Sequence, residues 1–468
     1  MVMEEKMKHV SSVVSRRKLL QRAGVLAGAA AMGGSTIWTP TANAAPSWCL
    51  PGATIDVDFE HNRYHNASLD DLKCSRPTDG YAATKSGVLK HFSPNELRRT
   101  DYGLLLESWQ DTLNFWSRDL TKSVWKKTHI SAAPAPVGAD GTKAGGTRLK
   151  ATSNNAKVIQ TLDHVGRAIY WDSPQTAGHG RGGAIHEMFY IKRVKGTGPV
   201  KIVANCTANA WYDVTALLNT HTYTQVCVYY YGLPTSNIGL QMGTAGDEID
   251  VDMAQFEAEG HRNCVSAFSP FPTTDKILTR ATDYVTVMPQ SKLYKALAGK
   301  RGTVFVKSFN LLGDNGAFYH FRPPAYGRIF GLASGSSPYG AFWTHFQDGP
   351  FGVRTRVDHK KLANYAWQVP IQGATSMTHD AATVRTVLTW GDGKSSVVAN
   401  NGKVGIGKCT TADASGPLYL GLGGDFPTKF GHHVMFMVDG YIQRLTFIPD
   451  VVAGHGAALT VGPETIHR

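Results

Sequence analysis

The chain has 468 residues, of which 18% are charged and 10% are aromatic. It is therefore long enough for two or three domains, and its composition excludes a disordered protein. The net charge is +12 at pH 7. Residues 1–44, which we expect to be removed, hold six basic and two acidic residues, so the remaining chain keeps a charge of +8. That surplus favours either weak attraction to acidic polysaccharide or lipopolysaccharide, or a solvated basic surface with no specific partner.

The first 44 residues have the pattern of a twin-arginine signal peptide. Ser15-Arg16-Arg17-Lys18-Leu19-Leu20 contains the arginine pair, the segment from Val25 to Met32 is apolar, and Ala42-Asn43-Ala44 is a small-x-small cleavage site. The apolar segment is too short to span a bilayer, and no later segment has 18 consecutive apolar residues. The sequence therefore predicts an exported, periplasmic or secreted protein without a membrane span.

Six cysteines follow the predicted cleavage site, an even number that suits an oxidising compartment. Pairing within neighbouring regions suggests three disulfides, although six cysteines allow fifteen arrangements. The suggested pairs are Cys49–Cys74, Cys206–Cys227 and Cys264–Cys409. No pair has the C-x-x-C spacing of a zinc ribbon or a thiol redox centre.

Short alternating or apolar runs, separated by turn-forming residues, follow one another through the rest of the chain. They predict an all-β protein made of antiparallel sandwiches. The runs are Gly182 to Val194, Val200 to Ala204, Gln225 to Tyr231, Glu248 to Phe256, Thr303 to Phe309, Gly327 to Leu332, Val384 to Trp390, Leu418 to Leu422 and Gly440 to Ile448.

The fourth run carries three carboxylates, in the segment "GDEIDVDMAQFE" at residues 246–257. Strand alternation places three acids on one face and three apolar side chains on the other. The acids are Glu248, Asp250 and Asp252, and the apolar residues are Ile249, Val251 and Met253.

Three interpretations of these acids are open. The first is a solvated or salt-bridged strand face, and the second is a structural calcium site that uses Asp250 and Asp252. The third is an active site, because the run resembles the Glu-x-Asp-x-Glu strand of laminarinase-type retaining glucanases, with Asp252 in place of the last Glu. Glu248 would then be the nucleophile, Asp252 the acid/base and Asp250 an orienting group. A retaining mechanism needs carboxyl groups about 5–5.5 Å apart, whereas strand positions i and i+4 are about 13 Å apart at the backbone.

A proline-containing stretch from Ser266 to Thr274 predicts the boundary between two sandwiches, since proline is awkward inside a sheet. We expect a first sandwich at 109–265, a linker at 266–278 and a second sandwich at 279–450, in tandem. Residues 451–468 would form a C-terminal tail.

Motifs on both sides of this boundary resemble phage tail-fibre and head-spike proteins. The resemblance covers roughly residues 55–450, and the shared order of the motifs carries it. Before the first sandwich and in its first residues the motifs are Cys74-Ser75-Arg76-Pro77-Thr78, Gly87-Val88-Leu89, Arg99-Thr100-Asp101-Tyr102, Gly103-Leu104-Leu105-Leu106-Glu107, Thr112-Leu113-Asn114-Phe115, Ser117-Arg118-Asp119-Leu120 and Trp125. Around the boundary they are Ala254-Gln255-Phe256-Glu257, Pro270 to Thr274 and Thr279-Arg280-Ala281-Thr282-Asp283-Tyr284-Val285.

The resemblance implies a carbohydrate-binding-like jelly roll, closed by the acidic strand, and then a laminin G or concanavalin A-like sandwich. Residues 45–108 would be an extended segment that packs on the first sandwich. In such a family the acidic strand has no known catalytic role. The extra cysteines and the signal peptide depart from the family pattern.

Aromatic residues are the best candidates for binding, because sugars stack on Trp and Tyr in the loops of sandwiches. The expected glycan-binding residues of the second sandwich are Tyr339, Trp343, Tyr365 and Trp367. Trp125, Trp211 and Trp390 lie within strand patterns and are assigned to cores. The sequence contains no Gly-x-Ser-x-Gly nucleophile elbow, no His-Glu-x-x-His metalloprotease motif and no Gly-x-x-x-x-Gly-Lys-Ser/Thr phosphate-binding loop.

The sequence thus favours an exported, lectin-like or adhesion protein that binds polysaccharide or cell-surface glycan and has no chemistry of its own. Its only expected cofactor is the possible structural calcium, and nucleic acid is not an expected partner. A secreted endo-glycosidase that uses Glu248 and Asp252 is the first alternative. A structural surface or spike component is the second.

Overall fold

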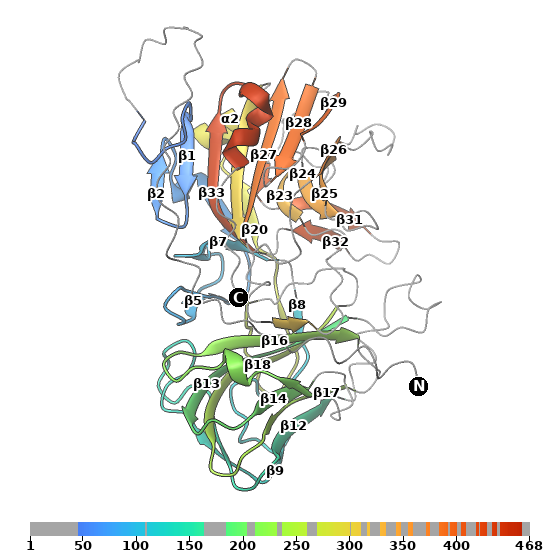
Figure 1. Ribbon diagram of the computed structural model, residues 1–468. Helices are drawn as coiled ribbons and strands as arrows, with labels where there is room; N and C mark the ends of the chain where they lie inside the picture. Colours follow the sequence, from blue (N-terminus) through green and yellow to red (C-terminus); the bar gives the residue numbers. More distant parts are fainter. Residues whose placement is uncertain are drawn as a thin grey trace, which may run out of the picture. The chain divides into compact units, whose positions relative to one another are not determined.

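The computed structural model (Figure 1) describes most of the chain after the predicted signal peptide. The described residues are 45–107, 110–162, 184–203, 211–231, 236–259, 269–299, 301–309, 316–318, 328–333, 343–347, 354–358, 371–374, 383–391, 394–399, 404–408, 418–420, 422–427, 433–437 and 440–460. Within these residues the fold is nearly all β, and each strand pairing except β16 with β22 is antiparallel. The predicted fold class is confirmed, with two antiparallel β-sandwiches.

The first sandwich packs a sheet of eight described strands on one of five. The larger sheet has the order β10 (Ile130–Pro134), β11 (Thr147–Ala151), β18 (Glu248–Glu259), β13 (Ala184–Lys195), β16 (Thr224–Tyr231) and β22 (Gly316–Phe318), with β8 (Gln110–Thr112) beside β18 and β19 (Leu278–Arg280) beside β8. The smaller sheet has the order β15 (Trp211–Asp213), β14 (Val200–Val203), β17 (Ser236–Met242), β12 (Ala156–Leu162) and β9 (Lys126–Thr128).

The second sandwich is formed by sheets of nine and seven described strands. The first has the order β2 (Arg63–His65), β1 (Ile55–Asp58), β33 (Gly440–Ile448), β21 (Gly302–Phe309), β27 (Thr383–Gly391), β28 (Lys394–Ala399) and β29 (Gly405–Lys408), with β7 (Gly103–Leu106) beside β33 and β6 (Arg99–Thr100) beside β7. The other has the order β26 (Ile371–Ala374), β25 (Arg354–Asp358), β24 (Trp343–Gln347), β23 (Arg328–Ala333), β30 (Leu418–Leu420), β20 (Tyr284–Val287) and β3 (Leu72–Ser75).

Smaller elements complete the described structure. They are the hairpins β4 (Gly80–Ala82) with β5 (Lys90–Phe92) and β31 (Leu422–Pro427) with β32 (His433–Met437), the α-helix α2 (Lys292–Leu297), and the 3₁₀ helices η2 (Leu69–Asp71), η3 (Thr215–Leu217) and η5 (Ala453–Thr460). Ser291 caps the N-terminus of helix α2, because its hydroxyl accepts the backbone N–H of Tyr294 at 2.9 Å. In the predicted C-terminal tail, Ala457 and Leu459 of η5 pack against a small buried cluster that contains Phe305.

Each of the nine runs predicted from the sequence is a strand, with ends that differ by at most three residues. The reason is that each run alternates or is continuously apolar, and where the side chains are described, most of the apolar ones are buried. The core of the first sandwich includes Val158, Phe189, Ile191 and Phe256, and that of the second includes Val304, Leu445 and Phe447. Trp125 and Trp390 are 1% and 2% exposed, so their assignment to cores is confirmed.

The segment before the first sandwich divides between the two sandwiches. Strands β1 and β7 pair with β33, and β3 pairs with β20, so these strands belong to the second sandwich. Tyr81 and Leu89 instead pack on the first sandwich, against Tyr190 and Met253. The expectation that residues 45–108 pack on the first sandwich therefore describes Tyr81 and Leu89 but not these three strands.

The described cysteines carry free thiols. Cys49 is partly exposed, whereas Cys74 and Cys227 are buried. The structure therefore contains neither the suggested Cys49–Cys74 bridge nor Cys206–Cys227. Burial raises the pKa of the Cys74 thiol to about 11, which keeps it protonated at neutral pH.

Candidate functional site

The acids of β18 face basic residues on both neighbouring strands. Asp250 lies opposite Arg148 of β11 and Lys192 of β13. The guanidinium of Arg148 donates to both oxygens of Asp250, at 2.8 and 3.1 Å, and the Lys192 ammonium is 3.4 Å from one of them. Glu248 lies opposite Lys150, with 3.4 Å between the charged atoms. Cross-strand pairs of opposite charge stabilise a sheet, so the salt-bridged interpretation describes these two acids.

Asp252 has no facing basic residue, and a loop arginine takes that place. Arg118 donates to both Asp252 oxygens, at 3.0 and 2.8 Å, and to both oxygens of Asp140 at 2.8 Å. The backbone N–H groups of Ala139 and Met253 donate to Asp252 as well, each at 2.8 Å. Burial nevertheless raises the pKa of Asp252, because desolvation of this carboxyl outweighs Arg118 and the backbone donors.

Glycines in the loop before β11 make room for this arginine clamp. A Cβ at Gly138 or Gly145 would lie 2.5 or 2.6 Å from Nη2 of Arg118, and one at Gly146 would lie 3.0 Å from Cβ of Asp252. Gly146 also has a φ of +80°, which a residue with a side chain adopts at a cost. The loop is therefore shaped around the ion pair.

These contacts limit what the acids can do chemically. A nucleophile or a general acid must reach a substrate atom, yet each oxygen of Asp252 already accepts two hydrogen bonds. Calcium needs six to eight oxygen ligands, whereas Arg148 and Arg118 occupy the oxygens of Asp250 and Asp252. The described residues contain no group of three or more potential metal ligands. Arg118 and Arg148 thus take the place of a cation, and the calcium site stays a prediction.

The predicted glycan-binding residues of the second sandwich lie largely outside the described structure. Tyr339, Tyr365 and Trp367 are not among the described residues. Trp343 is the first residue of β24, where its backbone pairs with Asp358 of β25. These four residues therefore remain predictions.

Trp211 differs from the prediction, because it is half-buried and not part of the core. It begins β15, the edge strand of the smaller sheet of the first sandwich, and lies opposite Val203 of β14. The next residue, Tyr212, packs on the core, so strand alternation turns Trp211 to the outer face. The Lys157 ammonium, from β12, is 5.3 Å from the centroid of the Trp211 ring, within the range of a cation–π contact.

Polar side chains surround this tryptophan on the outer face. Lys157, Gln241 and Lys201 form one row across β12, β17 and β14, because they are direct register partners. Beside this row, Ile159 of β12 lies opposite Gly239 of β17, and Val203 of β14 lies opposite Trp211. A Cβ on Gly239 would lie 2.9 Å from the Ile159 side chain, so glycine leaves space for that side chain on the surface of the sheet. The result is an aromatic ring beside a strip of amide and ammonium groups.

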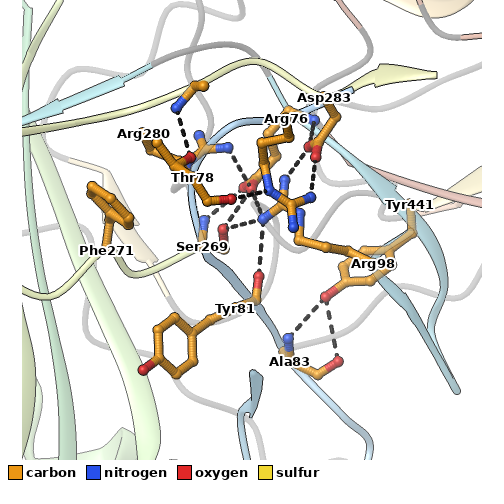
Figure 2. Close-up of polar contacts among 12 residues, drawn as sticks. Arg76, Thr78, Tyr81, Ala83, Arg98, Ser269, Phe271, Arg280, Asp283 and Tyr441 are labelled. Atoms are coloured by element: carbon orange, nitrogen blue, oxygen red, sulfur yellow. Dashed lines mark hydrogen bonds and ion pairs between the residues drawn. The ribbon is translucent and has the colours of Figure 1, made fainter. Parts of the chain in front are cut away.

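A second charged cluster joins the segment before the first sandwich to the residues after it (Figure 2). Arg98 donates to Ser269 Oγ and forms ion pairs with Glu107, at 2.6 Å, and Asp283. Arg76 donates to the other Asp283 oxygen at 2.7 Å. Arg76, Arg98 and Asp283 are at most 1% exposed. Charges this deeply buried need partners, which fixes the chain around them.

The carboxylates of this cluster are held in the ionised form. Burial alone would raise the pKa of Glu107, but Arg280 and Arg98 hold it below its usual value. Burial acts in the same direction on Asp283, and Arg98 and Arg76 lower its pKa below the usual value. Arg280 is 3.1 Å from Glu107. This arrangement makes the cluster a structural element, since each of these charged groups has a partner of opposite charge.

The motifs that resemble phage tail-fibre proteins supply this cluster. Arg76, Glu107, Arg280 and Asp283 each lie in one of those motifs. The sequence alone did not bring them together, because up to 207 residues separate the bonded side chains. Gly80 also makes room for this cluster, since a Cβ there would lie 2.8 Å from the Arg98 side chain.

Comparisons with known proteins identify no family. No family model and no curated protein matches the chain. Among solved structures, a pentraxin from Limulus polyphemus is 12% identical, covers 36% of this chain and 75% of its own, and has a TM-score of 0.24. A tandem CBM22 domain from Paenibacillus barcinonensis is 10% identical over 73% and 99%, with a TM-score of 0.23. Mouse laminin alpha1 domains LG4-5 are 10% identical over 58% and 82%, with a TM-score of 0.19. Likeness at this level carries no argument about function.

Proposed function

We propose that this protein is exported and binds glycan through its first sandwich, without catalysing a reaction. The observation that carries the proposal is Trp211 on the outer face of the five-stranded sheet. An aromatic ring beside hydrogen-bonding side chains suits a sugar, which offers a flat C–H face and several hydroxyls. Lys157, Gln241 and Asn237 supply donors and acceptors on that face.

Two further points belong to the proposal. The twin-arginine pattern supports export, and among the described residues no helix is long and apolar enough to cross a membrane. The order of the motifs supports kinship with phage tail-fibre or head-spike modules. The expected export and the order of the motifs together support a glycan-binding role in adhesion.

Affinity electrophoresis of residues 45–468 through gels that contain neutral and acidic polysaccharides tests the proposal. We expect at least one polysaccharide to retard the protein, and Trp211→Ala to abolish the retardation. Trp48→Ala is a matched control, because Trp48 is also half-buried with a cation, Arg63, 5.0 Å from its ring centroid. Retardation that survives Trp211→Ala would place binding elsewhere, and the second-sandwich aromatic residues would be tested next.

The catalytic alternative is separated by a reducing-end assay on soluble β-glucans. If the wild type released reducing ends and Glu248→Gln did not, the proposal that the protein binds glycan without catalysing a reaction would be overturned. The ion pairs of Asp250 and Asp252 lead us to expect no release. Absence of retention on every polysaccharide would favour the structural-component alternative.

A further inference from the structure

We infer that the glycan bound on the Trp211 face is anionic, a polysaccharide that carries carboxylate groups. The inference rests on the proposed function and adds the chemical class of the ligand. Its basis is the charge of the five-stranded sheet and the position of one ammonium group over the stacking ring.

The five strands of this sheet carry four lysines and one acid. Lys127 is used internally, because its ammonium lies within 3.1 Å of four backbone carbonyl oxygens, those of Leu120, Thr121, Lys122 and Trp125. Lys126, Lys157 and Lys201 share the outer face with Trp211, as their register partners show. None of these three lysines forms an ion pair with a described carboxylate. The outer face therefore has a positive charge that the described part of the protein does not balance.

The single acid on the described strands of this face does not offset three lysines. Asp213 lies opposite Lys201 on the edge strand, and one of its oxygens accepts the backbone N–H of Thr215 at 2.9 Å. The contrast with the larger sheet of the same sandwich is clear. There Arg148, Lys150 and Lys192 each have a carboxylate of β18 within 3.4 Å, so these three basic residues are not available to a ligand.

The position of Lys157 favours an acidic sugar over a neutral one. Its ammonium is 5.3 Å from the Trp211 ring centroid, so a sugar that stacks on the ring also meets this charge. A neutral sugar that stacks on the ring displaces the ammonium and offers it only hydroxyl oxygens in return for the lost cation–π contact. A carboxylate keeps the ammonium in place and forms a charge-assisted hydrogen bond with it.

The row of lysines suits a chain with repeated charges. Lys157 and Lys201 lie on strands separated only by β17, which places their backbones about 10 Å apart. Both long side chains can therefore reach carboxylates on one bound chain, with Gln241 between them to hydrogen-bond a hydroxyl. A single charged sugar would use one lysine, so the geometry points to a polyuronate-like polymer.

The test compares uronate polymers with their methyl esters, which keep the sugar chain and lose the charge. Dissociation constants of residues 45–468 are measured by affinity electrophoresis with polygalacturonate, alginate and both esters. We expect at least tenfold tighter binding to an acid form than to its ester. Lys157→Gln/Lys201→Gln should weaken acid binding at least tenfold and leave ester binding unchanged, while Trp211→Ala should lower both.

A double variant elsewhere controls for net charge. Lys73→Gln/Lys90→Gln removes two exposed lysines outside the first sandwich, one of which also lies over a ring, with Lys90 4.6 Å from the Phe92 centroid. This variant should bind like the wild type, and thermal unfolding confirms that each variant is folded. Equal binding of acid and ester, both lost in Trp211→Ala, would overturn the anionic ligand and keep the proposed function. Acid binding that ignores Trp211→Ala would indicate unspecific charge attraction, and binding of no polymer would overturn both.

Discussion

The three acids of β18 are explained by residues that lie about a hundred positions earlier in the chain. Asp250 and its partner Arg148 are separated by 102 residues, and Asp252 and Arg118 by 134. A run of carboxylates read alone resembles an active site, because its partners are not part of the pattern. The alternation that placed the acids on one face was correct. What the sequence could not supply was the pairing of strands, which brings Arg148 and Lys192 to either side of Asp250.

Replacement of Asp283 should be among the most damaging single changes. Asp283→Asn leaves Arg76 and Arg98 buried without their shared counter-ion, and breaking a buried ion pair in this way costs about 3–5 kcal/mol. Chemical denaturation measures the loss of unfolding free energy. Asp450→Asn is the control, since its ion pair with Arg301 is on the surface and should leave the midpoint unchanged. Equal effects of the two variants would contradict the structural role of the buried cluster.

The same cluster predicts how stability depends on pH. The pKa values of Glu107 and Asp283 are lower in the folded chain than in the unfolded one, so their contribution is complete above about pH 5 and is lost as the pH falls through the folded values. The pKa of Asp252 is raised, so this carboxyl changes the stability with the opposite sign, but it is one group against two. We expect the thermal midpoint to be constant from pH 7 to 5 and to fall below pH 4.

The variant Glu107→Gln tests whether Glu107 contributes to the loss of stability at acidic pH. The variant should be destabilised at pH 7 and should lose less on acidification than the wild type, because one of the titrating groups is gone. If the thermal midpoint of the variant fell by the same amount on acidification, other carboxylates would be the cause.

The calcium prediction is tested by chelation. Because Arg148 and Arg118 already neutralise Asp250 and Asp252, we expect EDTA to leave the thermal midpoint of the protein unchanged, with excess magnesium as the control for ionic strength. A midpoint that falls in EDTA and returns with added calcium would show that a calcium site exists.

At the scale of one element, β18 shows where pattern reading stops. Odd-numbered residues Ile249 and Val251 enter the core, as alternation predicts, but Met253 does not. It has a left-handed φ of +51°, and the register with β13 shifts at this point, which defines a β-bulge. After the bulge, Ala254 and Phe256 are the core residues. The prediction that Met253 shares a face with Val251 is therefore wrong, since one extra residue changes the side.

Deleting residues from this strand separates the bulge from the regular part. Without Met253 the remaining residues alternate without interruption, so each keeps its face, and the loss is the buried methionine, about 2–5 kcal/mol. Without Val251, Asp252 moves to the core face, and a charge enters an apolar core. We expect cooperative thermal unfolding at a lower midpoint for the first deletion and no cooperative transition for the second. Equal outcomes would contradict the bulge.

The short N-terminal strands were missed for a related reason. Strand β1 has the sequence IDVD, in which Asp56 and Asp58 are buried, so its pattern does not suggest an interior strand. Arg444 and Thr446 of β33 donate to Asp56, and Arg63 donates to Asp58. The long strands were predictable because apolar residues alone specify them, whereas β1 depends on partners that pairing provides.

At the scale of the whole molecule, the second sandwich is not complete without the start of the chain. Strand β1 lies between β2 and β33, and β3 pairs with β20. A fragment of residues 279–460 therefore exposes apolar edges of both sheets. We expect this fragment to be insoluble or unfolded, and addition of residues 45–107 as a separate chain to restore a cooperative transition, measured by circular dichroism. A stable isolated fragment would show that the N-terminal strands are accessories.

The pairing of β1 with β33 also sets an order of events during synthesis. Ile55 lies opposite Phe447, so this contact cannot form until the chain has been synthesised as far as residue 447. The strands that pair within residues 126–259 are complete much earlier and can fold while the ribosome is still at work. Such distant contacts make the closing step slow, because a very long loop has to be closed first. A chain that is cut short before β33 would therefore carry a folded first sandwich and an unclosed second one, a natural target for proteolytic quality control.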